Sequence, residues 1–351
     1  MYKATEGVGE CPRTGVYLTG IPCTSVYHKI VYIAQMPIAA SCFSKQSERT
    51  NLMQNLKVAV IGLDTSHSVE LPRLCMAPDV PADKKVDGLT VTACLRFETP
   101  FQNKEGLDKR QAQLEAWGIK VTECFDEAVA DCDAIMIEIN DPAPHLPYFE
   151  KVVKLGKPIF LDKPLAGSLE DGRKILELTQ KYNAKVFSCS SLPLTPTIPV
   201  AIDKLGGEAI LQGHTFGALG TAPAGESLIW YGVHSFEMLQ RLMGCGAEKV
   251  FAVDDGVSVV TNVVYDGERR GLIESIRGMW SYGGRVQSQT KTEFFHVDNS
   301  RLYFYLLTCI RDFFRGDPAP IAMEQTFEGL AMMCAALESL KTGTWAKVEK
   351  L

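Results

Sequence analysis

Short apolar runs alternate with helix-like segments through the first half of this chain, and this alternation most constrains its fold. The runs cover residues 57–62, 91–97, 133–139, 158–162 and 184–188. Segments such as 144–155, which lie between the runs, carry apolar residues at helical spacing. Strands that alternate with helices form a parallel sheet with helices on both faces. The sequence therefore predicts an α/β fold, with a Rossmann-like, doubly wound domain over residues 55–189.

The pattern changes near residue 190, where three prolines punctuate a loop. Strand-like segments follow at residues 210–216, 250–253, 257–265 and 272–279. Two helical segments, 302–315 and 325–342, close the chain and each ends at a glycine. This arrangement predicts a C-terminal α+β domain over residues 190–351, built on a mainly antiparallel, open sheet.

Residues 1–54 show no clear helical or strand period. A second methionine, Met53, stands just before the first strong strand, so a mis-assigned start codon or a poorly ordered extension is expected. The alternative is a targeting or partner-binding arm. The apolar run at 30–41 is short and broken by Gln35 and Pro37, which argues against an export signal.

Composition narrows the class of protein. The chain has 351 residues, 46% hydrophobic and 22% charged, as expected for a soluble enzyme of two domains. A net charge of −6 without a Lys/Arg block predicts no nucleic-acid partner. No apolar run approaches the roughly 18 residues of a membrane helix. The 11 cysteines form no CxxC pair, which favours reduced thiols and a cytoplasmic location.

One segment delivers a lysine to the end of a predicted strand. In Leu155–Leu165 the apolar run 158–162 is followed by Lys163 and then Pro164, where the chain turns. The carboxyl ends of parallel strands border the crevice in which such sheets bind ligands. A lysine there can donate or accept a proton, because burial and neighbouring charges shift its pKa readily. The alternative is a surface lysine that ends an ordinary strand.

The loop after the first strand occupies the place of a glycine-rich phosphate loop. It reads Gly62-Leu63-Asp64-Thr65-Ser66-His67. Only the first glycine of a G-x-G-x-x-G pattern is present, since Asp64 and His67 hold the other two positions. Thr65 and Ser66 could cap the next helix and donate hydroxyl groups to a phosphate, and His67 could add a cation. The alternative is that Asp64 or Thr65 only caps the helix and no nucleotide binds.

Two further segments carry polar groups. Asn140, Asp141 and His145 follow the strand at 133–139 and would face the same crevice, although this loop is equally explained by proline and aspartate punctuation. His234 and Glu237 are three residues apart on a predicted helix and share one face. They could act as acid/base groups, bind a polyol or bind a metal, or His234 could be structural. No third ligand accompanies this pair, so no metal site is predicted.

Taken together, residues 55–351 resemble the Gfo/Idh/MocA family, named after glucose–fructose oxidoreductase and inositol dehydrogenase. Gly156–Leu165 (GKPIFLDKPL) is similar to the family signature G-K-x-V-x-x-E-K-P, with Asp162 in place of glutamate. Gly232-Val233-His234 resembles the G-x-H segment of the second domain, and residues 335–343 resemble the last helix.

The resemblance implies NAD or NADP as the cofactor and a sugar, polyol or related small molecule as the substrate. Lys163, between Asp162 and Pro164, would bind near the nicotinamide and polarise the substrate, and His234 would be the general base. Trp230 stands where the family often has an aspartate, so His234 lacks that partner and Glu237 is a possible substitute. The Trp230 ring, next to Tyr231, could instead stack on a sugar.

Two expectations concern preference and assembly. Arg96 ends the second predicted strand, where a cation would favour the 2′-phosphate of NADP. The open sheet predicts a homo-oligomer, a dimer or tetramer.

The leading hypothesis is an NAD(P)-dependent oxidoreductase that acts on a sugar or polyol hydroxyl. The rival is a non-catalytic relative that senses a nucleotide or ligand, which the altered phosphate loop and the missing aspartate favour.

Overall fold

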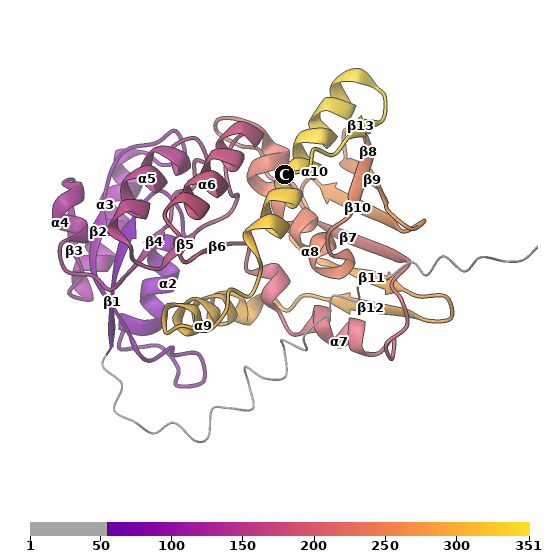
Figure 1. Ribbon diagram of the computed structural model, residues 1–351. Coiled ribbons are helices and arrows are strands. Elements are labelled where there is room, and N and C mark those ends of the chain that lie inside the picture. Colours follow the sequence, from indigo (N-terminus) through magenta and orange to yellow (C-terminus); the bar gives the residue numbers. More distant parts are fainter. Residues whose placement is uncertain (1–54) are drawn as a thin grey trace, which may run out of the picture. The chain divides into compact units, whose positions relative to one another are not determined.

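The computed structural model describes residues 55–351, and Figure 1 shows their helices and strands. The expectations for residues 1–54 lie outside this described part. One sheet has six parallel strands in the order β3-β2-β1-β4-β5-β6. Its strands are β1 (Leu56–Ile61), β2 (Leu89–Leu95), β3 (Lys120–Thr122), β4 (Ala134–Ile137), β5 (Ile159–Leu161) and β6 (Val186–Ser188). The predicted Rossmann-like sheet is confirmed.

Helices connect these strands and cover the sheet. They are α2 (His67–Met76), α3 (Lys104–Ala116), α4 (Phe125–Val129), α5 (His145–Val152) and α6 (Leu169–Lys181). The central strands are buried on both faces because their side chains are apolar in both directions; Val58 to Ile61 of β1 are fully covered. The strand order reverses at β1, so the crevice for ligands is expected between the carboxyl ends of β1 and β4.

The second sheet has seven strands in the order β12-β11-β7-β10-β9-β8-β13. Neighbouring strands are antiparallel except β7 and β10, which confirms the mainly antiparallel prediction. The strands are β7 (Gln212–Ala218), β8 (Ala247–Asp254), β9 (Ser258–Tyr265), β10 (Arg270–Ile276), β11 (Gly283–Gln287), β12 (Thr292–His296) and β13 (Ala346–Lys347).

Two helices pack on this second sheet, α8 (Val233–Met243) on β7 and β10 and α10 (Met323–Thr342) on β8 (Figure 1). The short helix α7 (Thr197–Asp203) lies against β12 and β11. Residues of β9 alternate between buried and more exposed, as expected when one face of a sheet is covered. No helix of residues 55–351 is both long and apolar enough to span a bilayer.

The helix α9 (Leu302–Phe314) follows the second sheet in the chain but packs against α2 beside the first sheet (Figure 1). Its residues Leu306, Leu307 and Ile310 share a core with the apolar strands of the first sheet. The Phe313 ring lies 4.9 Å from that of Phe187 in β6. The two sheets are therefore joined by shared packing as well as by the chain. The predicted domain boundary at residues 189 and 190 stays a prediction.

Candidate functional site

The loops after β1 and β4 approach each other closely at the carboxyl edge of the first sheet. Gly62 has a φ of +109°, and a Cβ at this position would lie 2.3 Å from the Glu138 carbonyl oxygen. Only glycine fits such a conformation and such a contact. The one glycine retained from the expected pattern is therefore required by the backbone at this point.

Asp64 ties these two loops together. Its carboxylate, which is 1% exposed, accepts hydrogen bonds from the backbone N–H of Asn140 at 2.8 Å and of Asp141 at 3.2 Å. The Thr99 hydroxyl donates a third bond at 2.7 Å. The Leu63 carbonyl, beside it, accepts a bond from Arg110. The Asp64 charge is therefore directed at protein donors, and the loop is braced from within.

The remaining loop residues lie at the start of α2. The buried Thr65 hydroxyl accepts a bond from the His67 backbone N–H, which makes Thr65 the side chain that caps the first turn. Ser66 is exposed and makes no such cap; its side chain is hydrogen-bonded to Tyr303. Ser66 is thus the exposed hydroxyl of this loop, with Tyr303 as its partner.

Three ionisable side chains meet behind this loop. His67 Nδ1 lies 2.8 Å from Asp162 Oδ2 and 3.9 Å from Glu138 Oε2. Glu138 follows β4, Asp162 follows β5, and both carboxyl groups are fully buried. Glu138 is not among the residues predicted from the sequence. Its signal is an acidic residue within the otherwise apolar stretch 134–139.

Burial favours the protonated form of both carboxyl groups, but the charges next to them differ. Burial and the nearby Asp162 charge raise the pKa of Glu138 well above its usual value. Burial also opposes ionisation of Asp162, but His67 and Lys163 together hold the pKa of this carboxyl below its usual value. The surroundings therefore favour the charged form of Asp162 more than that of Glu138.

Lys163 lies where the first sheet faces the second. It is 4% exposed, and its peptide bond to Pro164 is cis. Its Nζ lies 5.9 Å from the centre of the Tyr231 ring. Tyr231 belongs to a π-helical turn, Leu228–Gly232, that leads into α8. The predicted crevice lysine therefore meets an aromatic residue from the second half of the chain.

His234 and Glu237 share the buried face of α8, and both contact Ser190. The Ser190 hydroxyl lies 2.7 Å from His234 Nδ1, and its backbone N–H donates to Glu237 Oε2 at 2.5 Å. Ser190 follows β6 closely and is not among the predicted site residues. Glu237 thus reaches His234 only through Ser190. No local pattern signals Ser190, since it is one serine in the run Ser188–Ser191.

The charges around this pair are set by burial. Burial lowers the pKa of His234 well below its usual value, and the Lys163 and His67 charges lower it further. Burial raises the pKa of Glu237 to about 8, while the bond from Ser190 opposes that rise. His234 is therefore a neutral imidazole at neutral pH. Its Nδ1 is paired with Ser190, which leaves Nε2 for a ligand.

Aromatic residues line the space between the two sheets. The Trp230 indole N–H donates to Asn140 Oδ1 at 2.9 Å, which connects the turn before α8 with the loop after β4. The Tyr231 ring lies edge-on to His234, with centres 5.0 Å apart, and its hydroxyl is hydrogen-bonded to Tyr282. The predicted residues Trp230, Tyr231, His234, Lys163 and Asn140 are thus brought together.

Other predicted residues are occupied by the protein. His145 is fully buried, and its ring nitrogens face the carbonyl oxygens of Ile139 and Leu165, so no ring atom is exposed to a ligand. Asp141 accepts a bond from the Ala143 backbone N–H. The Arg96 guanidinium donates to Asp108 and Gln111 of α3, so this cation is already paired.

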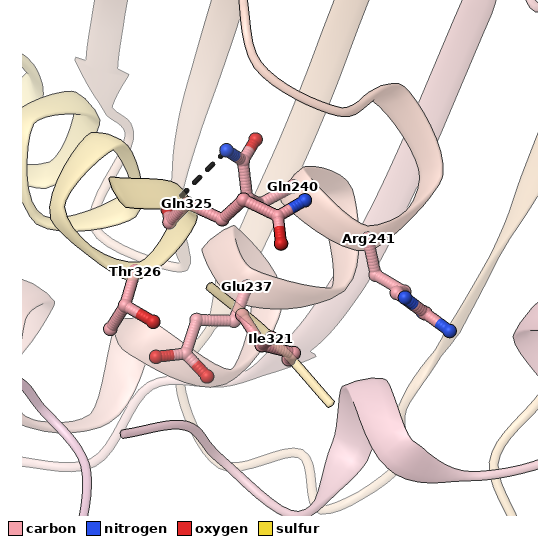
Figure 2. Close-up of a pocket in the computed structure, with 6 residues that line it drawn as sticks. All are labelled: Glu237, Gln240, Arg241, Ile321, Gln325 and Thr326. Atoms are coloured by element: carbon pink, nitrogen blue, oxygen red, sulfur yellow. Dashed lines mark hydrogen bonds between the residues drawn. The ribbon is translucent and has the colours of Figure 1, made fainter. Parts of the chain in front are cut away.

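A small pocket lies at the junction of α8 and the start of α10 (Figure 2). Gln240 Nε2 donates to the Gln325 carbonyl at 3.3 Å, and the Thr326 hydroxyl donates to the carbonyl oxygen of Ser188. Of the predicted site residues, only Glu237 lines this pocket. Its walls are Glu237, Gln240, Arg241, Ile321, Gln325 and Thr326.

Residues 56–189 match the model of the Gfo/Idh/MocA family, described as an oxidoreductase family with an NAD-binding Rossmann fold. A search of curated proteins found no match. The matched residues form the first sheet and include Gly62, Asp64 and Lys163.

Solved structures share the fold of the whole described region. A myo-inositol dehydrogenase from Corynebacterium glutamicum has a TM-score of 0.68 at 16% identity, over 85% of this chain and 100% of the other. A putative myo-inositol dehydrogenase from Sinorhizobium meliloti gives 0.67 at 16%, over 84% and 100%. GenD2 from gentamicin A biosynthesis, solved with NAD, gives 0.67 at 14%, over 86% and 98%. At these identities the likeness shows the fold alone.

Proposed function

We propose that the chain, whose residues 56–189 match the Gfo/Idh/MocA oxidoreductase family model, is a nicotinamide-dependent dehydrogenase of a sugar or polyol hydroxyl. One observation carries this proposal. Lys163, from the carboxyl end of the first sheet, and His234, from α8, both lie against the Tyr231 ring, at 5.9 Å and 5.0 Å. A cation and a neutral base that flank one space are the two groups that oxidation of an alcohol needs.

The loop residues are compatible with a nicotinamide cofactor. The Asp64 carboxylate is taken up by two backbone N–H groups and a hydroxyl, so it is not directed at a phosphate. Ser66 is exposed at the N-terminus of α2, where helix N–H groups favour an anion. Ser66 and the backbone of the loop from Gly62 to Ser66, with Asn140, would hold the cofactor. When bound, the cofactor supplies the acceptor for a hydride from the substrate carbon.

The chain's own side chains perform the proton chemistry. His234 takes the hydroxyl proton on Nε2, while Ser190 accepts a hydrogen bond from Nδ1 as the ring becomes charged. The Lys163 ammonium group donates a hydrogen bond to the same substrate oxygen and stabilises negative charge on it. The Trp230 and Tyr231 rings provide flat apolar walls for the substrate face.

For the cofactor we propose a preference for NAD over NADP. Arg96 would favour a 2′-phosphate only if it were free, but its guanidinium donates to Asp108 and Gln111. A 2′-phosphate would compete with the Asp108 carboxylate for this cation. Asp108→Asn should therefore raise the affinity for NADPH relative to NADH. The measurement is fluorescence titration with both cofactors, with Glu105→Gln on the exposed surface of the same helix as the control. An unchanged affinity ratio would contradict the assignment.

The function itself is tested by cofactor binding followed by turnover. NADH and NADPH are titrated against the purified protein, and oxidation of cyclic polyols and aldoses is then followed at 340 nm. Lys163→Met and His234→Asn should each abolish turnover, whereas Lys174→Met, on the exposed side of α6, should not. Absence of binding of either cofactor at millimolar concentration would refute the proposal.

The second candidate is a relative that senses a nucleotide or ligand without catalysis. It is favoured by the altered phosphate loop, in which Asp64 braces two loops that a glycine would leave free to adjust. The same titrations separate the two functions. A sensor would bind cofactor with the same affinity in wild type and His234→Asn, and would show no turnover with any polyol.

A further inference from the structure

The cluster of His67, Glu138 and Asp162 has no part in the reaction above, although it lies directly behind the cofactor loop. Each side chain offers one ligand atom, and these atoms all lie within 4.8 Å of one another. His67 begins α2, while Glu138 and Asp162 directly follow β4 and β5. We propose that they bind a single divalent transition-metal cation.

The distances suit one ion. His67 Nδ1 is 2.8 Å from Asp162 Oδ2 and 3.9 Å from Glu138 Oε2. Metal–ligand bonds to nitrogen or oxygen are about 2.0–2.2 Å long, so two ligand atoms of one tetrahedral ion lie about 3.4 Å apart. The two measured distances lie on either side of that value. Glu138 and Asp162 offer atoms within 4.8 Å of each other, and rotation about the Glu138 side-chain bonds can bring them closer.

The second observation is the state of the carboxylate oxygens. Both oxygens of Glu138 and Oδ1 of Asp162 are buried and make no hydrogen bond. The equally buried Asp64 accepts three hydrogen bonds, so the fold supplies donors to a buried carboxylate where no ligand is needed. Buried carboxylates without donors are costly unless they are paired or bind a metal. Three oxygens without donors beside one imidazole are what a cation would satisfy.

Nearby protein charges do not replace such an ion. Within residues 55–351, His67 is the only basic group within 4 Å of either carboxylate. Lys163 acts on both acids through its field, yet it forms no ion pair with them at that distance. A cofactor or substrate hydroxyl cannot reach these oxygens, because both acids are fully buried. A metal ion that binds while the chain folds, or that enters beside the His67 ring, can reach these oxygens.

The donor set indicates the class of ion. One imidazole nitrogen with two carboxylate oxygens suits zinc or manganese better than calcium, which prefers oxygen ligands alone. Such an ion would bind the loops after β1, β4 and β5 to one another at the edge of the sheet. It would also balance two acids that lie behind a loop expected to hold an anionic cofactor. This site is not required by the proposed dehydrogenase reaction.

The test measures metal on the full chain without any cofactor. The protein is stripped with a chelator, and zinc and manganese are then titrated by calorimetry, with metal content measured after dialysis. We expect about one equivalent per chain and a higher melting temperature. Glu138→Gln and Asp162→Asn should each weaken binding at least tenfold. Glu328→Gln is the matched control, because Glu328 is buried but accepts bonds from Gly246 and Lys350.

Two results would overturn the site. The first is that folded wild-type protein binds less than about 0.1 equivalent of either metal. A specific site would be filled almost completely at saturation. The second is binding that the Glu138 and Asp162 variants leave unchanged. If Glu138→Gln only raises the melting temperature and no metal binds, the two acids share a proton and the proposal fails. Failure of NADH binding in the earlier titrations leaves this result unaffected, since metal is measured without cofactor.

Discussion

At the scale of single residues, Ser190 links two groups that the sequence places on α8. Its hydroxyl is paired with His234 Nδ1 and its backbone N–H with Glu237. Substitution by alanine removes the first bond, together with the bond that the Leu192 backbone N–H donates to the same hydroxyl, and leaves the second. Ser190 is therefore a positioning residue for the proposed base, and the pH profile separates this role from an effect on stability.

We expect Ser190→Ala to lower kcat about tenfold, the equivalent of one hydrogen bond of about 1.4 kcal/mol. The acid limb of the pH profile should shift to lower pH, because the imidazolium of His234 loses an acceptor. Cofactor affinity should not change. Ser235→Ala is the control, since the buried Ser235 hydroxyl makes no hydrogen bond. A profile that keeps its shape in Ser190→Ala would show that the serine is only structural.

The raised pKa of Glu237 has a consequence for stability. In the folded chain Glu237 keeps its proton up to about pH 8, whereas an unfolded glutamate releases it near a pKa of about 4.3. The folded state therefore binds more protons between these values, and its stability falls as pH rises through that window. We expect the free energy of unfolding of Glu237→Gln to fall less with pH than that of wild type. The measurement is urea denaturation at about pH 5, 6.5 and 8. Glu338→Gln, on the exposed face of α10, should follow wild type; an equally steep decline in Glu237→Gln would contradict the assignment.

At the scale of elements, the apolar strands were predictable because β1, β4 and β5 are buried on both faces. The helix α3 and the strand β3 were not predicted. Only Leu107 and Leu114 of α3 are buried, so its sequence has no apolar stripe at helical spacing from which the helix could be predicted. The strands β11 and β12 were missed for a similar reason, since β11 begins Gly283-Gly284 and only Phe295 of β12 is buried.

The junction of β1 with the loop after β4 gives a test at this scale. Gly62→Ala places a Cβ 2.3 Å from a backbone carbonyl at a positive φ, so it should lower the free energy of unfolding by more than about 2 kcal/mol. Gly118→Ala is the matched control. Gly118 has a φ of +80° but no atom within 4 Å of the added Cβ, so only the cost of the backbone conformation, about 1 kcal/mol, is expected. Equal losses in urea denaturation would show that the close approach is unimportant.

At the scale of the whole molecule, the exposed apolar residues of the second sheet and its turns are the surface that we propose for a homo-oligomer. Phe294 of β12 is 73% exposed, and Val257, in the turn between β8 and β9, is 65% exposed. Large exposed apolar side chains favour burial by a partner. We expect a dimer or tetramer by light scattering, and Phe294→Asp should shift it toward monomer. A wild-type monomer at micromolar concentration would exclude this assembly.

The cytoplasmic location and the assignment of residues 190–351 to one domain also stay proposals at this scale. The packing of α9 on α2 bears on the second of these. A fragment that ends at residue 189 would leave the apolar side of α2 and the Phe187 region without Leu306, Ile310 and Phe313. The chain's last third therefore supports the core of its first sheet.

The sequence by itself determined the fold class, because two-sided burial and helical spacing are local patterns that neighbouring residues set. It also determined that Lys163 ends a strand and that His234 and Glu237 share a helix face. Only the tertiary structure decided which groups these residues meet. Ser190 reaches His234 across 44 positions of chain, and Asp64 reaches Asn140 across 76. The His67, Glu138 and Asp162 cluster forms because parallel strands bring their carboxyl ends to one edge, which no single stretch of sequence records.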